Sequence, residues 1–230
     1  MRQRSQGFRV YVMASPIGDI LSDFSVAALR VLERIEHVFI EAEDETAQRL
    51  RERGVIRPHH KVFSFEDPGG CLSVVERLVR DRVDFAVLAS SGIPGLVDPG
   101  WQVLDWLYRS GHWRDAQLHP VGVSSALDGA LALAGQQMDR FVFGGHYPEH
   151  YLLRELRSSH RSLPIIHYVR GPAIQAYLDS AWGAYRPSRV LIFQDLRKRD
   201  RSRVWVQSSQ QEQTTLSEQP ETDYVVLCIR

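Results

Sequence analysis

The chain has 230 residues, of which 43% are hydrophobic and 24% charged, as expected for a globular protein of one large or two small domains. Its 28 basic and 28 acidic side chains give a formal net charge of zero, which argues against a protein that binds nucleic acid over its whole surface. The longest apolar runs fall well short of a membrane span. The polar start, residues 1–7, lacks the apolar core of a secretion signal, so we expect a cytoplasmic protein without membrane contact.

The two cysteines, Cys71 and Cys228, lie far apart in the sequence. Their spacing matches no metal-binding pattern, so no metal site is expected. Cys228 lies in an apolar run and is expected to be a small core residue. A reducing compartment is the simplest setting for such a chain.

Strands and helices alternate along the first half of the chain. Period-two and short apolar runs predict strands at 8–13, 37–40, 61–64, 85–89 and 117–121. Apolar residues at helical spacing predict helices, the first starting near Val26 and the others covering 45–53, 71–82, 101–109 and 125–134. Ser22 or Ser25 is expected to cap the first helix. This alternation indicates an α/β fold with a mostly parallel sheet.

Loops of small residues follow three of these strands, at 15–19, 90–100 and 122–125. The loop from Ser90 to Gly100 holds three glycines, two prolines, two serines and one carboxylate. At eleven residues it is longer than the two to six usual for such a turn. Loops at the carboxyl ends of parallel strands bind ligands in open α/β sheets, so we interpret it as a ligand loop. The alternative is an ordinary strand-to-helix turn rich in Gly and Pro.

The second half has a different pattern. A strand within 141–148 leads into a linker, helices are expected at 150–160 and 172–182, and strands at 164–169, 189–193, 203–206 and 224–229. Consecutive strands with few helices indicate a mixed sheet. We therefore expect an N-terminal α/β domain over 1–145 and a smaller C-terminal domain over 146–230.

The order of the loops resembles that of the tetrapyrrole-methylase superfamily, and most of all its bacterial small-subunit ribosomal RNA cytidine 2′-O-methyltransferase branch. Five segments carry the resemblance: Ser15-Pro16-Ile17-Gly18-Asp19, Ala42-Glu43-Asp44, Ala89 to Gly95 with Asp98-Pro99-Gly100, Gly122 to Ala126, and Asp139 to Gly145 with Pro148. They span roughly residues 8–148. The chain departs from the branch at Ser90, where the branch has aspartate, and in a reduced second-domain motif around Tyr168.

The resemblance implies a two-domain fold with S-adenosylmethionine bound in a cleft between the domains, and a homodimer. It assigns cofactor contacts to the following residues: Pro16, Gly18, Ser90, Gly92, Gly95, Val123, Ser124, Ser125, Phe143, Gly144 and Tyr168. For either serine, 124 or 125, helix capping is an alternative role. Asp98 precedes a proline and is expected either to contact substrate or to fix its loop.

Two acidic residues are the candidate catalytic base. A ribose hydroxyl needs help to lose its proton, and Glu43 and Asp44 follow a strand end. The alternative is that they start helix 45–53, where the helix dipole favours negative charge. Four side chains near the domain junction, those of His146, Tyr147, His150 and His167, are expected either to pack or to reach the site.

The resemblance implies methylation of ribosomal RNA in the small subunit. Two basic clusters, at 154–161 and 197–203, are expected to contact phosphate or to be solvated surface. Trp205 is expected either to stack on a base or to turn inward. The zero net charge and the reduced second-domain motif leave two alternatives: a methyltransferase with a small-molecule (tetrapyrrole-like) or peptide acceptor, and a cofactor-binding module without turnover.

Overall fold

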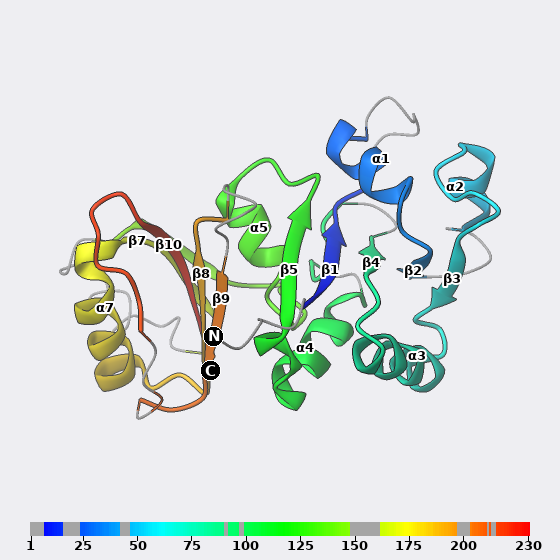
Figure 1. Cartoon of the computed structure of the whole chain (residues 1–230). Helices are drawn as coiled ribbons and strands as arrows, with labels where there is room; N and C mark the ends of the chain where they lie inside the picture. Colours follow the sequence, from blue (N-terminus) through cyan, green and yellow to red (C-terminus); the bar gives the residue numbers. More distant parts are fainter. Residues whose placement is uncertain are drawn as a thin grey trace, which may run out of the picture. The chain divides into compact units, whose positions relative to one another are not determined.

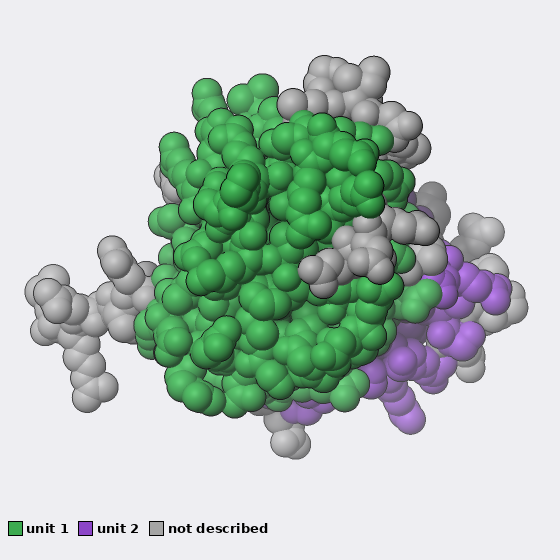
Figure 2. All heavy atoms as spheres, turned by 90° about the vertical axis from the view of Figure 1, so that its right-hand side faces the viewer, with its two compact units in different colours: residues 1–138 green, residues 139–230 purple. Residues whose placement is uncertain are grey.

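The computed structural model describes residues 7–15, 24–41, 47–89, 92–96, 99–147, 162–196, 203–210, 212 and 215–230. The chain divides into two compact units, residues 1–138 and 139–230, which Figure 2 colours separately. Each unit has its own sheet. The domain boundary expected after residue 145 falls inside β6 (Val142–His146), a strand that pairs with β7 (Ile165–Arg170) of the second unit.

The first unit is built on a five-stranded sheet in the order β3-β2-β4-β1-β5 (Figure 1). Its strands are β1 (Phe8–Met13), β2 (His37–Ile40), β3 (Lys61–Ser64), β4 (Phe85–Leu88) and β5 (Ala116–Val121). All four pairings are parallel, which confirms the predicted parallel sheet. Every residue of β2 and β4 is buried, as expected where helices cover both faces of a sheet.

Helices cover the two faces of this sheet. They are α1 (Val26–Leu32), α2 (Gln48–Glu52), α3 (Pro68–Arg80), α4 (Trp101–Ser110) and α5 (Ala126–Ala132). Leu32 of α1 and Leu50 of α2 share one core cluster with strand residues such as Ile40 and Leu88. Right-handed crossovers put α3 and α4 on the opposite face, where Figure 1 shows them side by side.

Local chemistry sets the helix ends. Ser25 caps α1 by accepting a 3.1 Å hydrogen bond from the Ala28 N–H, which confirms one of the two expected caps. Val26 is 65% exposed at the first turn, while Ala28 and Leu32 face the core. Helix α3 starts at Pro68, earlier than expected, because Asp67 accepts a hydrogen bond from Gly70 N–H and proline fits the first helical turn.

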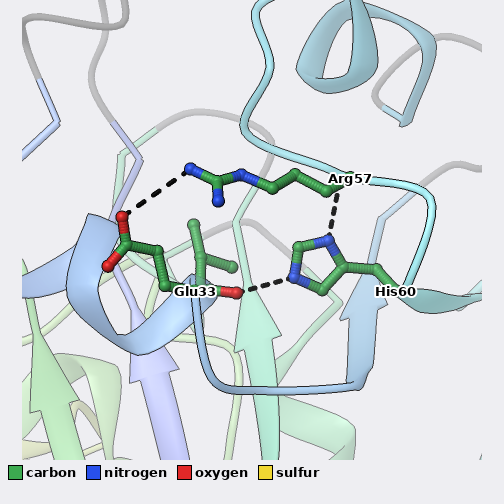
Figure 3. Close-up of polar contacts among 4 residues, drawn as sticks. Glu33, Arg57 and His60 are labelled. Atoms are coloured by element: carbon green, nitrogen blue, oxygen red, sulfur yellow. Dashed lines mark hydrogen bonds and ion pairs between the residues drawn. The ribbon is translucent and has the colours of Figure 1, made fainter.

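A buried histidine connects the end of α1 to the turn before β3. The Nδ1 atom of His60 accepts a 2.7 Å hydrogen bond from the Arg57 N–H, and its Nε2 lies 2.8 Å from the Leu32 carbonyl oxygen (Figure 3). The backbone partners fix the tautomer: Nδ1 accepts, so Nε2 carries the proton. Arg57 also pairs with Glu33 at 3.7 Å, but both side chains are half exposed, so this pair adds little stability.

The second unit has a five-stranded sheet in the order β6-β7-β10-β8-β9. Its other strands are β8 (Arg189–Gln194), β9 (Arg203–Gln207) and β10 (Asp223–Ile229). Only β6 and β7 pair in parallel; the remaining pairs are antiparallel, which confirms the predicted mixed sheet. The helix expected at 172–182 is divided into a 3-10 turn (Gly171–Ala173), α7 (Ile174–Ser180) and a π-helical turn (Ala181–Tyr185). The helix expected at 150–160 lies outside the described residues.

A polar network lies inside the second unit. His167 is fully buried, its Nδ1 is 3.1 Å from the Tyr177 hydroxyl, and that hydroxyl is 3.6 Å from the Cys228 sulfur. Cys228 is therefore a core residue, as expected. Of the two roles open for His167, packing is the one observed, and Tyr147 packs edge-on against it. Trp205 is half buried against Tyr224, so strand alternation turns it inward.

Among the described residues, none of the helices combines the length and apolar content needed to cross a membrane. Within the same residues, no three metal-binding side chains are grouped as a metal site.

Candidate cofactor site at the carboxyl edge of the parallel sheet

The strand order of the first unit places a topological switch point between β1 and β4. From β1 the chain crosses β4 to reach β2, whereas from β4 it crosses β1 to reach β5. Ligands bind in the crevice that such opposed connections leave at the carboxyl ends of the strands. Because β4, β1 and β5 are neighbours, the predicted loops after these three strands emerge together. Residues far apart in the sequence are thereby assembled at one edge.

Backbone hydrogen bonds join the first two loops. The Ser15 N–H donates to the Gly92 carbonyl and the Gly92 N–H donates to the Ser15 carbonyl, each at 2.9 Å. The buried Ser15 hydroxyl also donates to the Ala89 carbonyl. These contacts tie the end of β1 to the start of the long loop after β4.

The two predicted glycines of that loop have different surroundings. Both adopt left-handed backbone angles, with φ of +75° at Gly92 and +94° at Gly95. A Cβ on Gly95 would lie 3.0 Å from the Leu131 carbonyl oxygen, so this glycine is required by packing inside the unit. A Cβ on Gly92 would have no atom within 4 Å among the described residues. Within the described part of the chain, the Gly92 backbone is therefore open on the side where a Cβ would lie, which would let a ligand approach closely.

The loop after β5 is fixed by a capping box. Asp128 accepts hydrogen bonds from the Ser124 and Ser125 N–H groups at 3.3 and 3.0 Å, and the Ser125 hydroxyl accepts from the Asp128 N–H. The capping role considered for Ser125 is therefore present in the structure. Both serines are exposed and Val123 is half buried. Asp128 was not among the site residues predicted from the sequence, although the Ser-x-x-Asp pattern at 125–128 is typical of a helix-capping box.

Gly122 brings this loop against the end of β1. It has φ of +78°, and a Cβ there would lie 3.1 Å from the Ala14 carbonyl oxygen. The Ala14 N–H in turn donates to the Val121 carbonyl at 2.9 Å. The loops after β1 and β5 are therefore held as closely as those after β1 and β4.

Several predicted residues lie outside the described residues. These are Pro16, Gly18, Glu43, Asp44, Ser90, Asp98 and His150. The acidic pair follows β2, whose last residue is Ile40, and β2 pairs with β4 in the sheet. The basic clusters also lie outside, apart from Arg203 at the start of β9.

The second unit gathers the remaining predicted residues into an aromatic cluster. Tyr168 meets Phe143 edge-on at 5.2 Å between ring centres and His146 at 5.3 Å. Phe143 is 43% exposed, and the strand pairing shifts between Phe143 and His146, where Gly144 and Gly145 lie. Gly145, with φ of +70° and no described atom near its Cβ position, belongs to the same open segment.

The chain was compared with known proteins. No protein-family model matches it. Proteins named Ribosomal RNA small subunit methyltransferase I from Leptospira biflexa, Pseudomonas aeruginosa and Thermotoga maritima are 28%, 32% and 25% identical to it over 147, 142 and 159 residues. The chain is similar in sequence to these methyltransferases. The resemblance inferred from the loops is thereby confirmed.

The matches cover part of each protein. They span 64%, 60% and 66% of this chain and 58%, 47% and 68% of the three relatives, so the chain spans about half to two thirds of their length. Among solved structures, a uroporphyrin III C-methyltransferase from Thermus thermophilus aligns with 95% of this chain and 96% of its own, at 16% identity and a TM-score of 0.37. The fold class given above depends on the strand order and pairing.

Proposed function

We propose that the chain is an S-adenosylmethionine-dependent methyltransferase. The observation that carries this proposal is the meeting of three small-residue loops at the switch point, in a chain related to methyltransferases. Methyl transfer from a sulfonium donor is an in-line displacement, so most of the catalysis is positioning of the two reactants. The backbone hydrogen bonds between Ser15 and Gly92 and the capped turn at 124–128 supply fixed positions for such a purpose.

In this proposal the chain holds the cofactor largely through backbone groups. Among the described residues, Gly92 offers open backbone, and the Asp128 carboxylate holds the backbone of Ser124 and Ser125 in the loop that contains Val123. We also propose contacts from Pro16, Gly18 and Ser90, and from Phe143, Gly144 and Tyr168 of the second unit. The edge of an exposed aromatic ring such as Phe143 is suited to pack on an adenine base. Gly95 has a structural role in this proposal, because it lets the loop after β4 pack closely against the Leu131 backbone.

The acceptor proposed is a ribose 2′-hydroxyl of small-subunit ribosomal RNA. The names of the relatives support the small-subunit RNA, and we propose Glu43 or Asp44 as the base that removes the hydroxyl proton. A ribosomal substrate implies a cytoplasmic reaction. A homodimer remains part of the proposal.

Transfer to ribosomal subunits from two strains tests the acceptor. Small subunits from cells lacking the gene should accept labelled methyl groups from the purified protein, because their target is unmodified. Subunits from the parent strain, already methylated, should accept almost none. Equal or absent labelling of both preparations by a protein that binds S-adenosylmethionine would contradict the ribosomal acceptor. It would favour a small-molecule or peptide acceptor or a module without turnover.

A further inference from the structure

The second unit contains an open cavity with no part in the proposed function. It has a volume of about 350 Å³, within the lower range of small-ligand pockets. It lies between α7, the π-helical turn and the segment after β9. Its walls are formed by Gln175, Leu178, Asp179, Trp182, Gln207, Gln210, Glu212 and Thr215.

Hydrogen bonds hold one wall of this cavity in place. The Trp182 indole N–H donates to the Gln207 side-chain oxygen at 3.2 Å, and the Gln207 amide donates to the Glu212 carbonyl at 3.3 Å. The Ser208 N–H donates to the Glu212 carboxylate at 2.9 Å. Gln207 itself is 5% exposed, and its hydrogen bonds to Trp182 and Glu212 are partly buried. The wall is thus formed before any ligand arrives, which reduces the ordering cost of binding.

The chemistry of the walls is acidic and rich in hydrogen-bond acceptors. Asp179 and Glu212 line the cavity from different elements, and no lysine, arginine or histidine is among the lining residues. Within the described part of the chain, neither carboxylate is paired with a basic side chain. Leu178 and Trp182 add apolar surface. A ligand matched to these walls is cationic, carries many N–H donors and has an apolar or planar body.

We propose that this cavity binds a guanidinium group. A guanidinium has five N–H donors in a rigid plane, pairs with carboxylates and packs on aromatic rings, whereas an ammonium is a compact and strongly hydrated charge. Its stem is apolar and fits beside Leu178. The group arrives either on a free small molecule or as an arginine side chain of another polypeptide. The proposal is independent of methyl transfer.

The Trp182 indole N–H signal in a two-dimensional NMR spectrum reports binding directly. The chain has five tryptophans, and a Trp182→Phe variant identifies the signal of this one. Titration with N-acetyl-arginine amide should move that signal saturably in the millimolar range, because exposed ion pairs are individually weak. The citrulline analogue has the same shape without the charge and should leave the signal in place. Equal shifts with both compounds, or none with either, would overturn the proposal.

Two variants connect the signal to the cavity. Asp179→Asn combined with Glu212→Gln should weaken binding about tenfold, since two exposed charge partners are lost. Glu76→Gln on α3 removes an exposed carboxylate elsewhere and should bind as the wild type does. Unchanged binding by the double variant would overturn the site. An arginine-containing peptide that binds more tightly than the amino-acid derivative identifies a polypeptide source; equal affinity identifies a free small molecule.

Discussion

Ser15 and Gly92, which lie far apart in the sequence, pair through two backbone hydrogen bonds of 2.9 Å. This pair joins the loops after β1 and β4 at the switch point of the parallel sheet. Gly92 adopts a left-handed conformation there, and no atom of the described residues lies within 4 Å of the place where a side chain would begin. The pair therefore combines the rigidity and the access that a ligand loop needs.

Gly122→Ala should destabilise the first unit more than Gly54→Ala. Both glycines have left-handed φ, +78° and +69°, so alanine costs each about 1–2 kcal/mol of backbone strain. A Cβ on Gly122 would lie 3.1 Å from the Ala14 carbonyl oxygen, whereas a Cβ on Gly54 would have no atom of the described residues within 4 Å. Urea unfolding monitored by circular dichroism measures the difference. Equal free energies of unfolding for the two variants would contradict the close approach.

Asp128→Ala should weaken both α5 and cofactor binding. The loss of the acceptor for Ser124 and Ser125 should lower the free energy of unfolding by about 1 kcal/mol, the usual cost of a lost cap. If loop 122–125 contacts S-adenosylmethionine, its dissociation constant should also rise. Asp67→Ala removes the cap of α3 and serves as the matched control, with a similar stability loss but unchanged affinity. Unchanged affinity for S-adenosylmethionine in both variants would show that loop 122–125 does not contribute to cofactor binding.

The stability of the first unit should fall as the pH drops below about 6.5. Burial lowers the pKa of both His60 and His37 from the ordinary value of 6.5. The unfolded chain therefore binds protons below about pH 6.5 that the folded chain does not yet bind, and each proton favours unfolding. The slope should not exceed about 1.4 kcal/mol per pH unit for each histidine. Urea titrations between pH 7.5 and 5.5 measure it, a range set by the histidine pKa of about 6.5.

His60→Phe isolates one of these contributions. The variant should be less stable at neutral pH by about 1–3 kcal/mol, because the Arg57 N–H and the Leu32 carbonyl lose their partner. It should also show a shallower loss of stability toward acidic pH. A wild-type slope in His60→Phe would show that His60 is not a source of the pH dependence.

Both thiols should be unreactive in the folded protein. Burial raises the pKa of Cys71 and of Cys228 to about 12, and neither cysteine is in a disulfide. The thiolate is the reactive form, so it is scarce at pH 8. A disulfide reagent should modify almost no thiol in native buffer and both thiols in urea. Rapid modification of one thiol in native buffer would show that its surroundings are open.

The strands could be predicted from the sequence because a strand that is buried on both faces consists of a short, continuous run of apolar residues. Phe85 to Leu88 is wholly apolar and is wholly buried in β4. Helix ends were less predictable, since they depend on single capping groups. Asp67 caps α3, which therefore starts at Pro68, three residues before the predicted start at residue 71. The spacing of apolar residues predicts which face of α1 is buried, but it does not predict that Val26 in the first turn is exposed to solvent.

The candidate site could be predicted as loops but not as contacts. Composition identified the loops that contain Ser15 and Gly92, yet only the strand order shows that they are neighbours. Gly92 and Gly95 look alike in sequence, and only packing shows that one is open and the other lies against Leu131. Asp128 was missed because its function is to shape backbone, which apolar periodicity does not reveal.

Calorimetric titration of S-adenosylmethionine into the Gly92→Trp and Gly54→Trp variants tests the central claim most directly. Both substitutions place an indole on a left-handed glycine whose Cβ position has no atom of the described residues within 4 Å, so the variants share the backbone strain and differ in position. The wild type and Gly54→Trp should bind S-adenosylmethionine, and folded Gly92→Trp should lose binding because the indole fills the space beside the loop. Undiminished binding by Gly92→Trp, or no binding by the wild type at millimolar ligand, would contradict the account.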